Sequence, residues 1–572
     1  MTEQNWVVAA KRADFKGIAE KFGIDQVTAR LIRNRDMVTE EEIREYLYGG
    51  LEDLHDPRLM KGVPEAAEML CSAAAEGARI RVIGDYDMDG VSASYILLNG
   101  LQKLGADVDV RIPDRVRDGY GLNRTLVEEA IADERTMILT CDNGIAAAEA
   151  IQCARQAGLR VIVTDHHEIP FTEENGEKVF HLPPADVVID PKQPDCPYPY
   201  DGLCGAAVAW KLIQAVFQNA GIPGTEAYRY LDIVGMATVG DVMDLCRENR
   251  ILVREGLKQL HHTGRPGLLE LIRQSGLEKE QIDVYHIGFV LGPCLNAGGR
   301  LDTALRALQL LCTESREEAA ETAAELVALN ARRKELTGQQ LEIAAGMVDH
   351  TDWQKDRVLV VYLPDCHESL AGIIAGRLRE KYNRPAYVLT GTGAALKGSG
   401  RSIEAYSMYE ELNSCRDILE KFGGHPMAAG LTLPADKREE FRERINAGCS
   451  LTEQDMMPKI TIDVPMPVSY VSRELIREFE KLRPFGKGNP RPLFAQKDMH
   501  VLSARVFGKN RNVLKMQMAD PEGRTVDAVY FGEADELLRY AEQKDTLDIV
   551  YYPAIDTWQG LEKLQITVQA YR

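Results

Sequence analysis

The chain has 572 residues, 45% of them hydrophobic, and this length predicts three or four domains because single hydrophobic cores stop growing well below it. No apolar run reaches the roughly 18 residues that a membrane span requires, and the N-terminus lacks a signal-peptide pattern, so we expect a cytoplasmic protein without a membrane partner. The net charge of −20 argues against a surface that is basic throughout, and the eleven cysteines, scattered without a C-x-x-C pair, argue against a zinc ribbon or disulfide framework.

Residues 1–70 predict an N-terminal helical segment that carries no recognisable chemistry. From about residue 75 to residue 245, apolar strands and amphipathic helices alternate at the spacing of βαβ units. This alternation predicts an α/β domain with a parallel sheet.

Three carboxylates follow the first predicted strand of this domain. Residues 81–83 end a short apolar run, and Asp85, Asp87 and Asp89 come next at alternate positions. Alternation in an extended turn can aim all three into the crevice at the carboxyl edge of the sheet. Because three such charges repel, a divalent cation is the simplest way to hold them together, although an aspartate-rich turn can also serve only as a helix cap.

Two later strands also end in polar turns. Asp142 follows the apolar residues 137–139, and Asp165, His166 and His167 follow the apolar residues 161–163. Three strand ends that deliver carboxylates and imidazoles to one edge predict a site for manganese or magnesium, with histidine favouring a transition metal.

The next stretch, residues 171–200, has many prolines and no period, so we expect a long loop near the site. His181 and Asp190 in this loop could be ligands, but structural roles are favoured. Residues 231–245 predict an apolar helix, in which Asp241 is costly unless it is paired or metal-bound.

Residues 292–300 predict a loop of small residues that ends in Arg300, a side chain suited to a phosphate. A proline-free stretch from 314 to about 348 predicts a long helix. A second α/β domain follows, with two glycine loops at residues 397–402 and 422–425 that could cradle phosphate.

From about residue 458 the chain shows short β-like segments separated by turns, which predict a small barrel of the OB type. Nine basic residues and a single acidic one lie between Lys481 and Lys515, so a locally positive surface is expected despite the acidic total. This run could instead be only a solvated face. Among the aromatic residues, Trp558 is the best candidate for an exposed base-stacking surface, whereas Tyr530, Phe531, Tyr551 and Tyr552 suit a core.

The triplet Asp165-His166-His167, together with Asp85-Tyr86-Asp87-Met88-Asp89-Gly90, resembles the DHH phosphoesterase superfamily, and within it the RecJ family of single-stranded-DNA-specific exonucleases. The resemblance extends over nearly the whole chain. It includes Leu203-Cys204-Gly205-Ala206, Thr238-Val239-Gly240-Asp241-Val242, Leu295-Asn296-Ala297-Gly298-Gly299-Arg300, Gly398-Ser399-Gly400-Arg401-Ser402 and Gly423-Gly424-His425. The sequence departs from the family pattern at Asp114, where asparagine is usual, at Cys366, where tryptophan is frequent, and at Gly240, where alanine is usual.

The resemblance implies a two-metal enzyme that removes nucleotides from the 5′ end of single-stranded DNA with Mn²⁺ or Mg²⁺, in DNA repair and recombination. In this family pattern, Asp142 would bridge the ions, Asp165 would orient a histidine, and His167 would face the scissile phosphate. The implied metal ligands are Asp85, Asp87, Asp89, Asp142, His166 and Asp241, and the implied substrate-binding residues are Arg115, Arg300, Ser399, Arg401, His425 and Trp558.

The domains implied are an N-terminal helical segment (1–70), a DHH catalytic domain (71–310), a connector helix (311–350), a DHH-associated domain (351–455) and an OB-fold domain (456–572). Single-stranded DNA is the expected partner of a monomer, with a single-strand-binding protein and a helicase as further candidates.

Two other hypotheses remain open from the sequence. A DHH phosphodiesterase for short oligonucleotides or other small phosphate substrates would share the site without needing the barrel. A non-catalytic replication scaffold would tend to lose acidic ligands, whereas every carboxylate position is occupied here.

Overall fold

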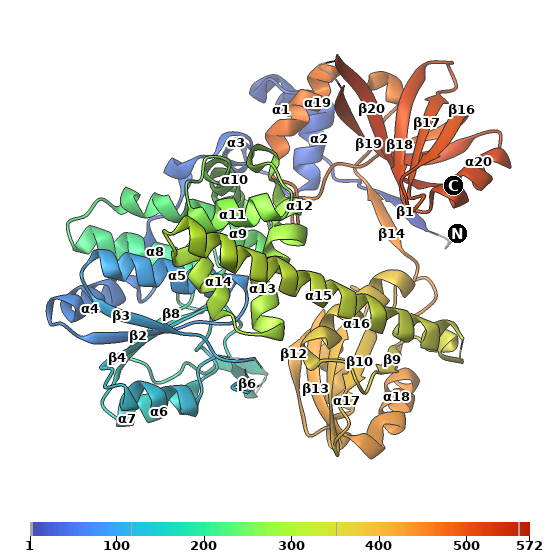
Figure 1. The fold of residues 1–572 in the computed structure, drawn as a ribbon. Coiled ribbons are helices and arrows are strands. Elements are labelled where there is room, and N and C mark those ends of the chain that lie inside the picture. Colours follow the sequence, from blue (N-terminus) through green and yellow to red (C-terminus); the bar gives the residue numbers. More distant parts are fainter. Residues whose placement is uncertain (1–3, 116, 120, 175, 351, 559–560) are drawn as a thin grey trace. The chain divides into compact units, whose positions relative to one another are not determined.

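The computed structural model describes residues 4–115, 117–119, 121–174, 176–350, 352–558 and 561–572. The chain forms two compact units, which are coloured along the sequence in Figure 1. The first contains residues 55–242 and 256–458, and the second contains residues 4–54, 243–255 and 459–572.

The first unit begins with a five-stranded sheet in which all neighbouring strands are parallel. Its order is β3-β2-β4-β5-β8, so the chain runs outward from β2 to β3 and then returns to β4 on the other side of β2. The crevice between β2 and β4 is therefore the switch point, where open α/β sheets bind ligands. The strands are β2 (Arg79–Ile83), β3 (Asp107–Arg111), β4 (Met137–Cys141), β5 (Arg160–Thr164) and β8 (Val187–Ile189).

Helices cover both faces of this sheet (Figure 1). One face packs on α6 and α7 through a core that includes Ile83, Ile138 and Val161, residues that each strand directs to the same side. On the other face, α5 packs against α8 and α9. The helices are α4 (Val63–Ala75), α5 (Met88–Lys103), α6 (Arg124–Ala132), α7 (Ala148–Gln156), α8 (Gly205–Asn219) and α9 (Leu231–Gly240).

The proline-rich stretch 171–200 differs from the loop that the sequence predicted. It contains an antiparallel hairpin, β6 (Phe171–Glu174) with β7 (Glu177–Phe180), and then β8, the edge strand of the sheet. Strand β8 has only three residues, so its sequence shows too little periodicity to be recognised.

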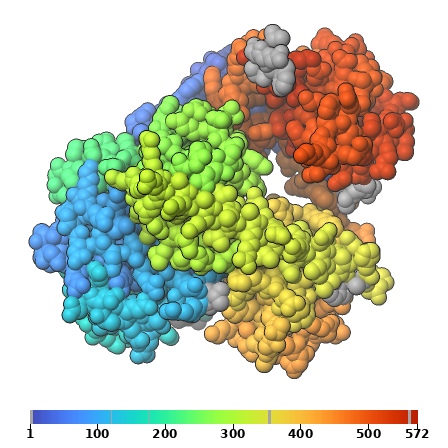
Figure 2. Space-filling view, viewed as in Figure 1, coloured from blue at the N-terminus to red at the C-terminus, as the bar shows by residue number. Residues whose placement is uncertain are grey.

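A group of helices follows, ending in the 34-residue α15. Helix α15 begins at the cap residue Ser315, whose hydroxyl accepts a hydrogen bond from the amide of Glu318. Figure 2 shows its surface, in yellow-green, continuing onto the second domain of the unit. The elements are α10 (Arg247–His261), whose residues up to 255 belong to the second unit, α11 (Pro266–Gln274), α12 (Val284–His286), the π-helical turn η5 (Ile287–Leu291), α13 (Gly292–Leu301), α14 (Leu305–Cys312) and α15 (Arg316–Asp349).

The second domain of this unit has a five-stranded mixed sheet of order β12-β13-β11-β10-β9. One face packs on α16 and the end of α15, and the other packs on α17 and α18. The elements are β9 (Leu359–Tyr362), α16 (Glu368–Tyr382), β10 (Ala386–Thr390), β11 (Ala395–Arg401), α17 (Met408–Ser414), β12 (Lys421–His425), β13 (Ala428–Pro434) and α18 (Arg438–Ala447).

The second unit is a barrel joined to the N-terminal helices. Five strands close because β16 pairs with both β17 and β19, which confirms the predicted OB-type barrel. Ile43 and Leu47 of the N-terminal helices share one core with Phe494 and Tyr551 of the barrel. The elements are β1 (Asn5–Val8), α1 (Phe15–Phe22), α2 (Gln26–Asn34), α3 (Glu40–Tyr48), β14 (Lys459–Ile462), β15 (Val464–Pro465), α19 (Arg473–Phe479), β16 (Phe494–Phe507), β17 (Val513–Ala519), β18 (Thr525–Phe531), α20 (Ala534–Glu542), β19 (Leu547–Trp558) and β20 (Leu561–Tyr571).

The start of the N-terminal segment of this unit also meets the start of its last segment, since β1 pairs in parallel with β14. Among the residues described, no helix combines the length and apolar character needed to span a bilayer.

Candidate active site

The predicted acidic and histidine residues converge at the carboxyl edge of the first sheet. Asp85, Asp142 and His166 follow β2, β4 and β5, and each is at most 5% exposed. Asp241 reaches the same place from the end of α9. The strand order places these loops side by side, so the sequence argument about strand ends holds in the structure.

Three groups of potential ligand atoms surround Asp142 and His166. The His166 Nε2 atom lies 3.0 Å from Asp142 Oδ1, 3.6 Å from Asp89 Oδ2 and 3.7 Å from Asp241 Oδ2. Ligand atoms lie within 4.8 Å of one another in each of three groups: Asp142, His166 and His167; Asp89, His166 and Asp241; Asp85, Asp87 and Asp142. Asp142 and His166 each belong to two groups, so more than one cation could be held through shared ligands.

The electrostatics of these carboxyl groups favour a cation. Burial, followed by the neighbouring acidic charges, raises the pKa of both Asp85 and Asp142 well above the usual range. In the described part of the chain, Asp85 Oδ1 and His166 Nδ1 are buried without a hydrogen-bond partner. A buried carboxylate oxygen without a donor is suited to a metal, and the donor set of oxygen and imidazole nitrogen fits Mn²⁺ and also suits Mg²⁺ through its oxygens.

Asp165 serves a different purpose from the other carboxylates. Its Oδ1 accepts hydrogen bonds from the amides of His166 (2.8 Å) and His167 (3.2 Å) and lies 2.7 Å from His167 Nδ1, while Oδ2 accepts one from the amide of Ile145 (2.9 Å). Burial opposes the ionised form, but the hydrogen bond and charge of His167 outweigh it and lower the pKa of Asp165.

The same pairing sets the charge of His167. Burial alone would lower the pKa of this imidazole, but the hydrogen bond and charge of Asp165 outweigh burial and raise the pKa to about 9. Asp165 therefore orients His167 and keeps it protonated in the metal-free protein.

Helix N-termini hold two of the remaining carboxylates. Asp87 caps α5, where its Oδ1 accepts hydrogen bonds from the amides of Asp89 (2.9 Å) and Gly90 (3.1 Å). Asp89 accepts hydrogen bonds from the first amides of α8, Gly205 (2.6 Å) and Ala206 (2.8 Å). These contacts fix both side chains at helix N-termini, which attract anions. For Asp89, burial outweighs the hydrogen bond from Ala206 and raises the pKa.

Gly205 is a further residue that shapes the site, and no role was predicted for it from the sequence. A Cβ atom at this position would lie 2.7 Å from Asp142 Cβ, so only glycine allows α8 to begin this close to the metal site. Asp142 itself has φ of 61°, a left-handed conformation that is rare outside glycine and is often found at functional sites. The Leu203-Cys204-Gly205-Ala206 motif was the available signal.

A cleft of about 320 Å³ lies next to this site and brings together residues from both domains of the first unit. Arg115 and Ser399 line it with Tyr86 and Lys397. The Arg115 guanidinium lies 4.9 Å from the centre of the Tyr86 ring.

The other two predicted arginines, Arg300 and Arg401, lie close enough to Arg115 for its charge to lower their pKa values. Burial, with the charge of Arg115 next, lowers the pKa of Arg300 to about 10 and that of Arg401 below its usual range. Arg300 donates a hydrogen bond to the carbonyl of Ser369 (2.9 Å), which links it to the second domain of the unit. A positive field so concentrated is suited to phosphate.

For two of the predicted substrate-binding residues, His425 and Trp558, the structure differs from the interpretation of the sequence. His425 is exposed at the end of β12, and it does not line the cleft described above. Trp558 ends β19 rather than lying in a turn, and its side chain lies outside the described residues.

Two of the three departures from the family pattern, Asp114 and Cys366, take part in local structure. Asp114 accepts a hydrogen bond from the amide of Arg117 (2.8 Å) within its loop. Cys366 is 6% exposed and contributes to the core under α16, so its thiol replaces no exposed stacking surface.

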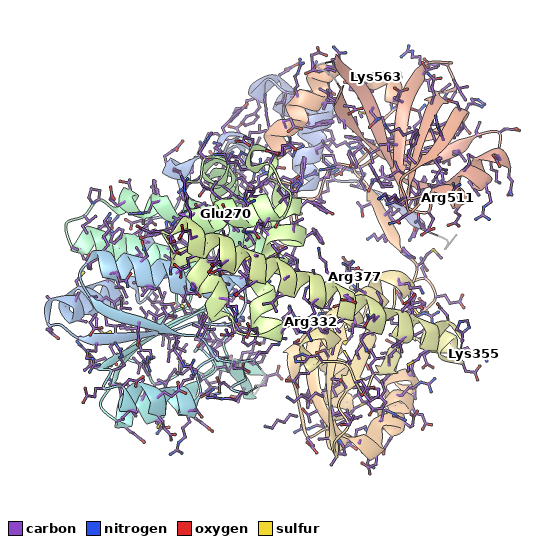
Figure 3. The ribbon with its side chains drawn as sticks, in the orientation of Figure 1. Glu270, Arg332, Lys355, Arg377, Arg511 and Lys563 are labelled. Atoms are coloured by element: carbon purple, nitrogen blue, oxygen red, sulfur yellow. The ribbon has the colours of Figure 1, made fainter. Side chains whose placement is uncertain are left out.

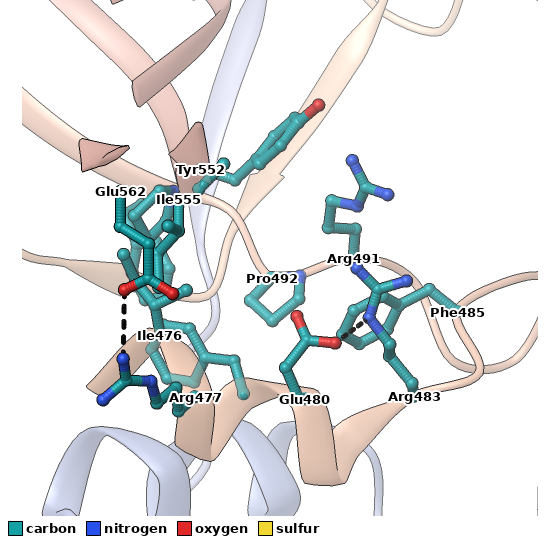
Figure 4. A pocket seen from close by; sticks show the side chains of 14 residues that line it. Ile476, Arg477, Glu480, Arg483, Phe485, Arg491, Pro492, Tyr552, Ile555 and Glu562 are labelled. Carbon is teal, nitrogen blue, oxygen red and sulfur yellow. Dashed lines mark hydrogen bonds and ion pairs between the residues drawn. The ribbon is translucent and has the colours of Figure 1, made fainter. Parts of the chain in front are cut away.

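In the second unit, ion pairs neutralise part of the predicted basic stretch. Figure 4 shows a pocket in which Arg483 of this stretch pairs with Glu480, while Arg477, just before the stretch, pairs with Glu562. The pocket has a volume of about 370 Å³, and the Arg491 guanidinium in its lining is 4.5 Å from the centre of the Tyr552 ring. Arg511 and Lys563, labelled in Figure 3, likewise pair with acidic residues, Asp535 and Asp527.

A smaller basic and aromatic patch lies on the outer face of the barrel. Arg505 on β16 is the cross-strand partner of Lys515 on β17, and both cations lie within 5.7 Å of the Phe507 ring centre. Phe531 on β18 is 61% exposed, contrary to the core role that the sequence suggested, whereas Tyr551 is fully buried. Exposed aromatic rings between cations are suited to nucleotides.

Comparison with known proteins identifies the class. Residues 79–238 match the DHH family N-terminal domain and residues 355–450 match the DHHA1 domain, so the chain has the two domains of a DHH phosphoesterase. Residues 462–570 match the RecJ OB domain. The chain belongs to the RecJ family.

Individual relatives support this assignment. The single-stranded-DNA-specific exonuclease RecJ of Bacillus subtilis is 36% identical over 99% of this chain and 71% of its own length. The protein of the same name from Escherichia coli is 33% identical over 89% of this chain and 90% of its own length. The crystal structure of Thermus thermophilus RecJ with Mn²⁺ matches with a TM-score of 0.83 and 28% identity, covering 99% of this chain and 79% of that one. A second structure from that organism contains Mg²⁺, so solved relatives carry both predicted metals.

Proposed function

We propose that this protein is a two-metal phosphodiesterase that removes nucleotides from the 5′ end of single-stranded DNA. The observation that carries the proposal is the convergence of Asp85, Asp87, Asp142, His166 and Asp241, with Asp142 shared between two ligand groups. The proposed ligands are these five and Asp89, and Asp142 is the proposed bridge.

The side chains around the metal site have separate roles in this proposal. Two bound cations would supply a nucleophile from water at neutral pH and neutralise charge on the phosphate. His167 faces the scissile phosphate as a cation, and Asp165 holds it in position through the 2.7 Å contact. Arg115 and Ser399 bind the phosphates beyond the cut from opposite walls of the cleft.

Arg300 and Arg401 complete this anion site. Both are largely buried, and both share the field of Arg115, so a phosphate would relieve the repulsion among three guanidinium groups. His425 remains a proposed contact of the 5′ terminus, and Trp558 a proposed base-stacking residue of the barrel. A slot between the two sheets would then select single strands over a duplex.

The small-substrate alternative is less well supported. Named relatives that match over most of the chain are single-stranded-DNA-specific exonucleases, and the exposed Phe531 with the pair Arg505 and Lys515 offers a surface that a dinucleotide would not need. Deleting the barrel is a poor test, because it would expose the apolar faces of the N-terminal helices that share its core. Phe531→Ala with Lys515→Ala is a better one, and it should weaken binding of long strands while dinucleotide hydrolysis is retained.

The central experiment uses single strands labelled at either end and digested with Mn²⁺. The wild-type protein should release the 5′ label first and leave a blunt duplex intact. Asp142→Ala should abolish release, whereas Asp195→Ala, which removes an exposed carboxylate paired with Lys61, should not. Release of the 3′ label first would contradict the proposed polarity.

Other parts of the proposal concern the setting of the reaction. We infer action in DNA repair and recombination in the cytoplasm, as a monomer, with a single-strand-binding protein and a helicase as partners that supply the strand. The proposed domain limits stay at 1–70, 71–310, 311–350, 351–455 and 456–572.

A further inference from the structure

Two exposed aromatic side chains form a stacked pair in the first unit. Tyr285 and Phe289 are 61% and 60% exposed, and their ring centres are 5.1 Å apart with an interplanar angle of 29°. His286 meets the Tyr285 ring edge-on at 5.7 Å. Two large rings that stack on each other while both stay exposed form a small apolar patch, and apolar patches are frequent at ligand and partner sites.

These rings belong to a helix that passes the metal site. Helix α12, the π-helical turn η5 and helix α13 are continuous from Val284 to Leu301, with α12 and α13 labelled in Figure 1. A Cβ atom at Gly292 would lie 3.1 Å from the Met88 sulfur, and one at Gly299 would lie 2.3 Å from the Tyr86 carbonyl oxygen. The helix therefore lies directly against the loop that carries Asp85 and Asp87.

The aromatic end is also close to Asp241. A Cβ atom at Gly288 would lie 3.8 Å from Val239 Cγ1, and Val239 is two residues before Asp241 at the end of α9. Gly288 lies in the π-helical turn, and such turns are often found at functional sites. The helix segment that carries Tyr285 and Phe289 therefore packs beside the end of α9, the helix that leads into Asp241.

One face of this helix leads from the aromatic pair to the phosphate-binding arginines. Phe289, Asn296 and Arg300 are spaced by seven and four residues, which places them on the same side of a helix. The Asn296 Oδ1 atom is buried without a hydrogen-bond partner among the described residues, and Arg300 lies within the fields of Tyr86 and Arg115. From residue 285 to residue 300 the helix rises about 22 Å, enough for several nucleotides of an extended strand.

We propose that Tyr285 and Phe289 form a base-stacking site for the nucleotides that lie on the 3′ side of the cut, so that this helix face guides the strand into the metal centre. The proposal rests on the proposed exonuclease function. The occupant is single-stranded DNA because the face is continuous with the phosphate site, and stacked rings accept any base. The 5′ phosphate lies at the Arg300 end and later bases lie at the Tyr285 end.

The test compares substrates that differ in length. For a 5′-phosphorylated 12-mer, the Tyr285→Ala/Phe289→Ala variant should raise KM at least about 10-fold at nearly unchanged kcat, because each stacked base is worth about 5- to 150-fold in binding. For a 5′-phosphorylated dinucleotide, which is too short to reach the rings, KM should stay within about twofold of wild type. The conservative variant Tyr285→Phe/Phe289→Tyr should restore long-strand binding.

Two controls separate stacking from general damage. Phe171→Ala/Phe180→Ala removes another exposed aromatic pair, 5.9 Å apart on the β6–β7 hairpin, and should leave the length dependence intact. Abasic sites introduced one at a time from the 5′ end should weaken wild-type binding at the stacked positions and leave the Tyr285→Ala/Phe289→Ala variant unaffected there.

The outcomes are distinct. An unchanged KM for the 12-mer, or an equal loss with both substrates, would overturn the stacking site and assign these rings to protein contacts or to folding. A wild-type protein that degrades no DNA of either length would instead refute the proposed function. Degradation by the wild type with equal efficiency at both lengths would refute only the stacking site.

Discussion

Replacing Gly205 with alanine should disrupt the metal centre through one methyl group. The new Cβ would lie 2.7 Å from Asp142 Cβ, 2.9 Å from its Oδ1 and 3.0 Å from its Cα. Carbon atoms in contact lie about 3.5 to 4.0 Å apart, so Asp142 or the start of α8 must move by roughly 0.8 Å or more. Both are buried, so either movement costs free energy.

Either movement changes the ligand set. A shift of Asp142 displaces the proposed bridging carboxylate, and a shift of α8 weakens the hydrogen bonds of 2.6 and 2.8 Å that hold Asp89. Overpacking of this kind costs about 1 to 3 kcal/mol in the free energy of unfolding. A misplacement near 1 Å in an active site costs on the order of 10²-fold in rate.

The assay combines Mn²⁺-dependent release of a 5′ label, calorimetric titration of Mn²⁺ and thermal unfolding. Gly205→Ala should lower kcat/KM by about 10²-fold, weaken Mn²⁺ binding and lower Tm by several degrees. Gly338→Ala is the matched control, because its Cβ would meet nothing within 4 Å in α15 and should add about 0.5 to 1 kcal/mol of stability. Wild-type activity and Mn²⁺ affinity in Gly205→Ala would refute the reasoning.

Three further outcomes follow from the same geometry. Burial raises the pKa of Asp85 and Asp142, so the folded metal-free protein binds more protons than the unfolded chain. The metal-free protein therefore loses stability as pH rises from about 4 toward neutrality. The gain in Tm on adding Mn²⁺ to chelator-treated protein should be larger at pH 8 than at pH 6. In Asp165→Asn, the new side-chain NH₂ group would face either the amide of Ile145 or Nδ1 of His167, both of which are donors to Asp165. This variant should reduce kcat by about 10²- to 10⁴-fold while circular dichroism shows that the fold is retained. A steady-state rate within threefold of wild type would exclude the orienting role. Burial raises the pKa of Asp190 to about 8, so Asp190→Asn should raise Tm relative to wild type at pH 8 but not at pH 4.5, and equal differences at both values would contradict a buried acid that resists ionisation.

Much of the metal centre could be predicted from the sequence because its ligands follow strand ends. Runs of apolar residues mark β2, β4 and β5, and in a parallel sheet their carboxyl ends must meet at one edge. Asp142 and His166, which are 24 residues apart in the sequence, come together because they follow the neighbouring strands β4 and β5.

The remaining features of the site depend on how closely two segments approach and on which side chains face solvent. Sequence periodicity does not reveal either. Gly205 looked like any helix-start glycine, because its importance lies in the distance to Asp142. Phe531 lies in an apolar strand and appeared to belong to the core, yet its strand turns that side chain to solvent. The exposed pair Tyr285 and Phe289 could not be separated by sequence from ordinary buried helix residues.

The interleaving of the second unit has a consequence for the order of biosynthesis. Residues 4–54 share a core with residues 459–572, so about 400 residues must be translated before the N-terminal helices meet the barrel. At about 5 to 20 residues per second this interval is roughly 20 to 80 seconds. During that time the apolar faces around Ile43 and Leu47 lack the barrel residues that cover them in the folded protein.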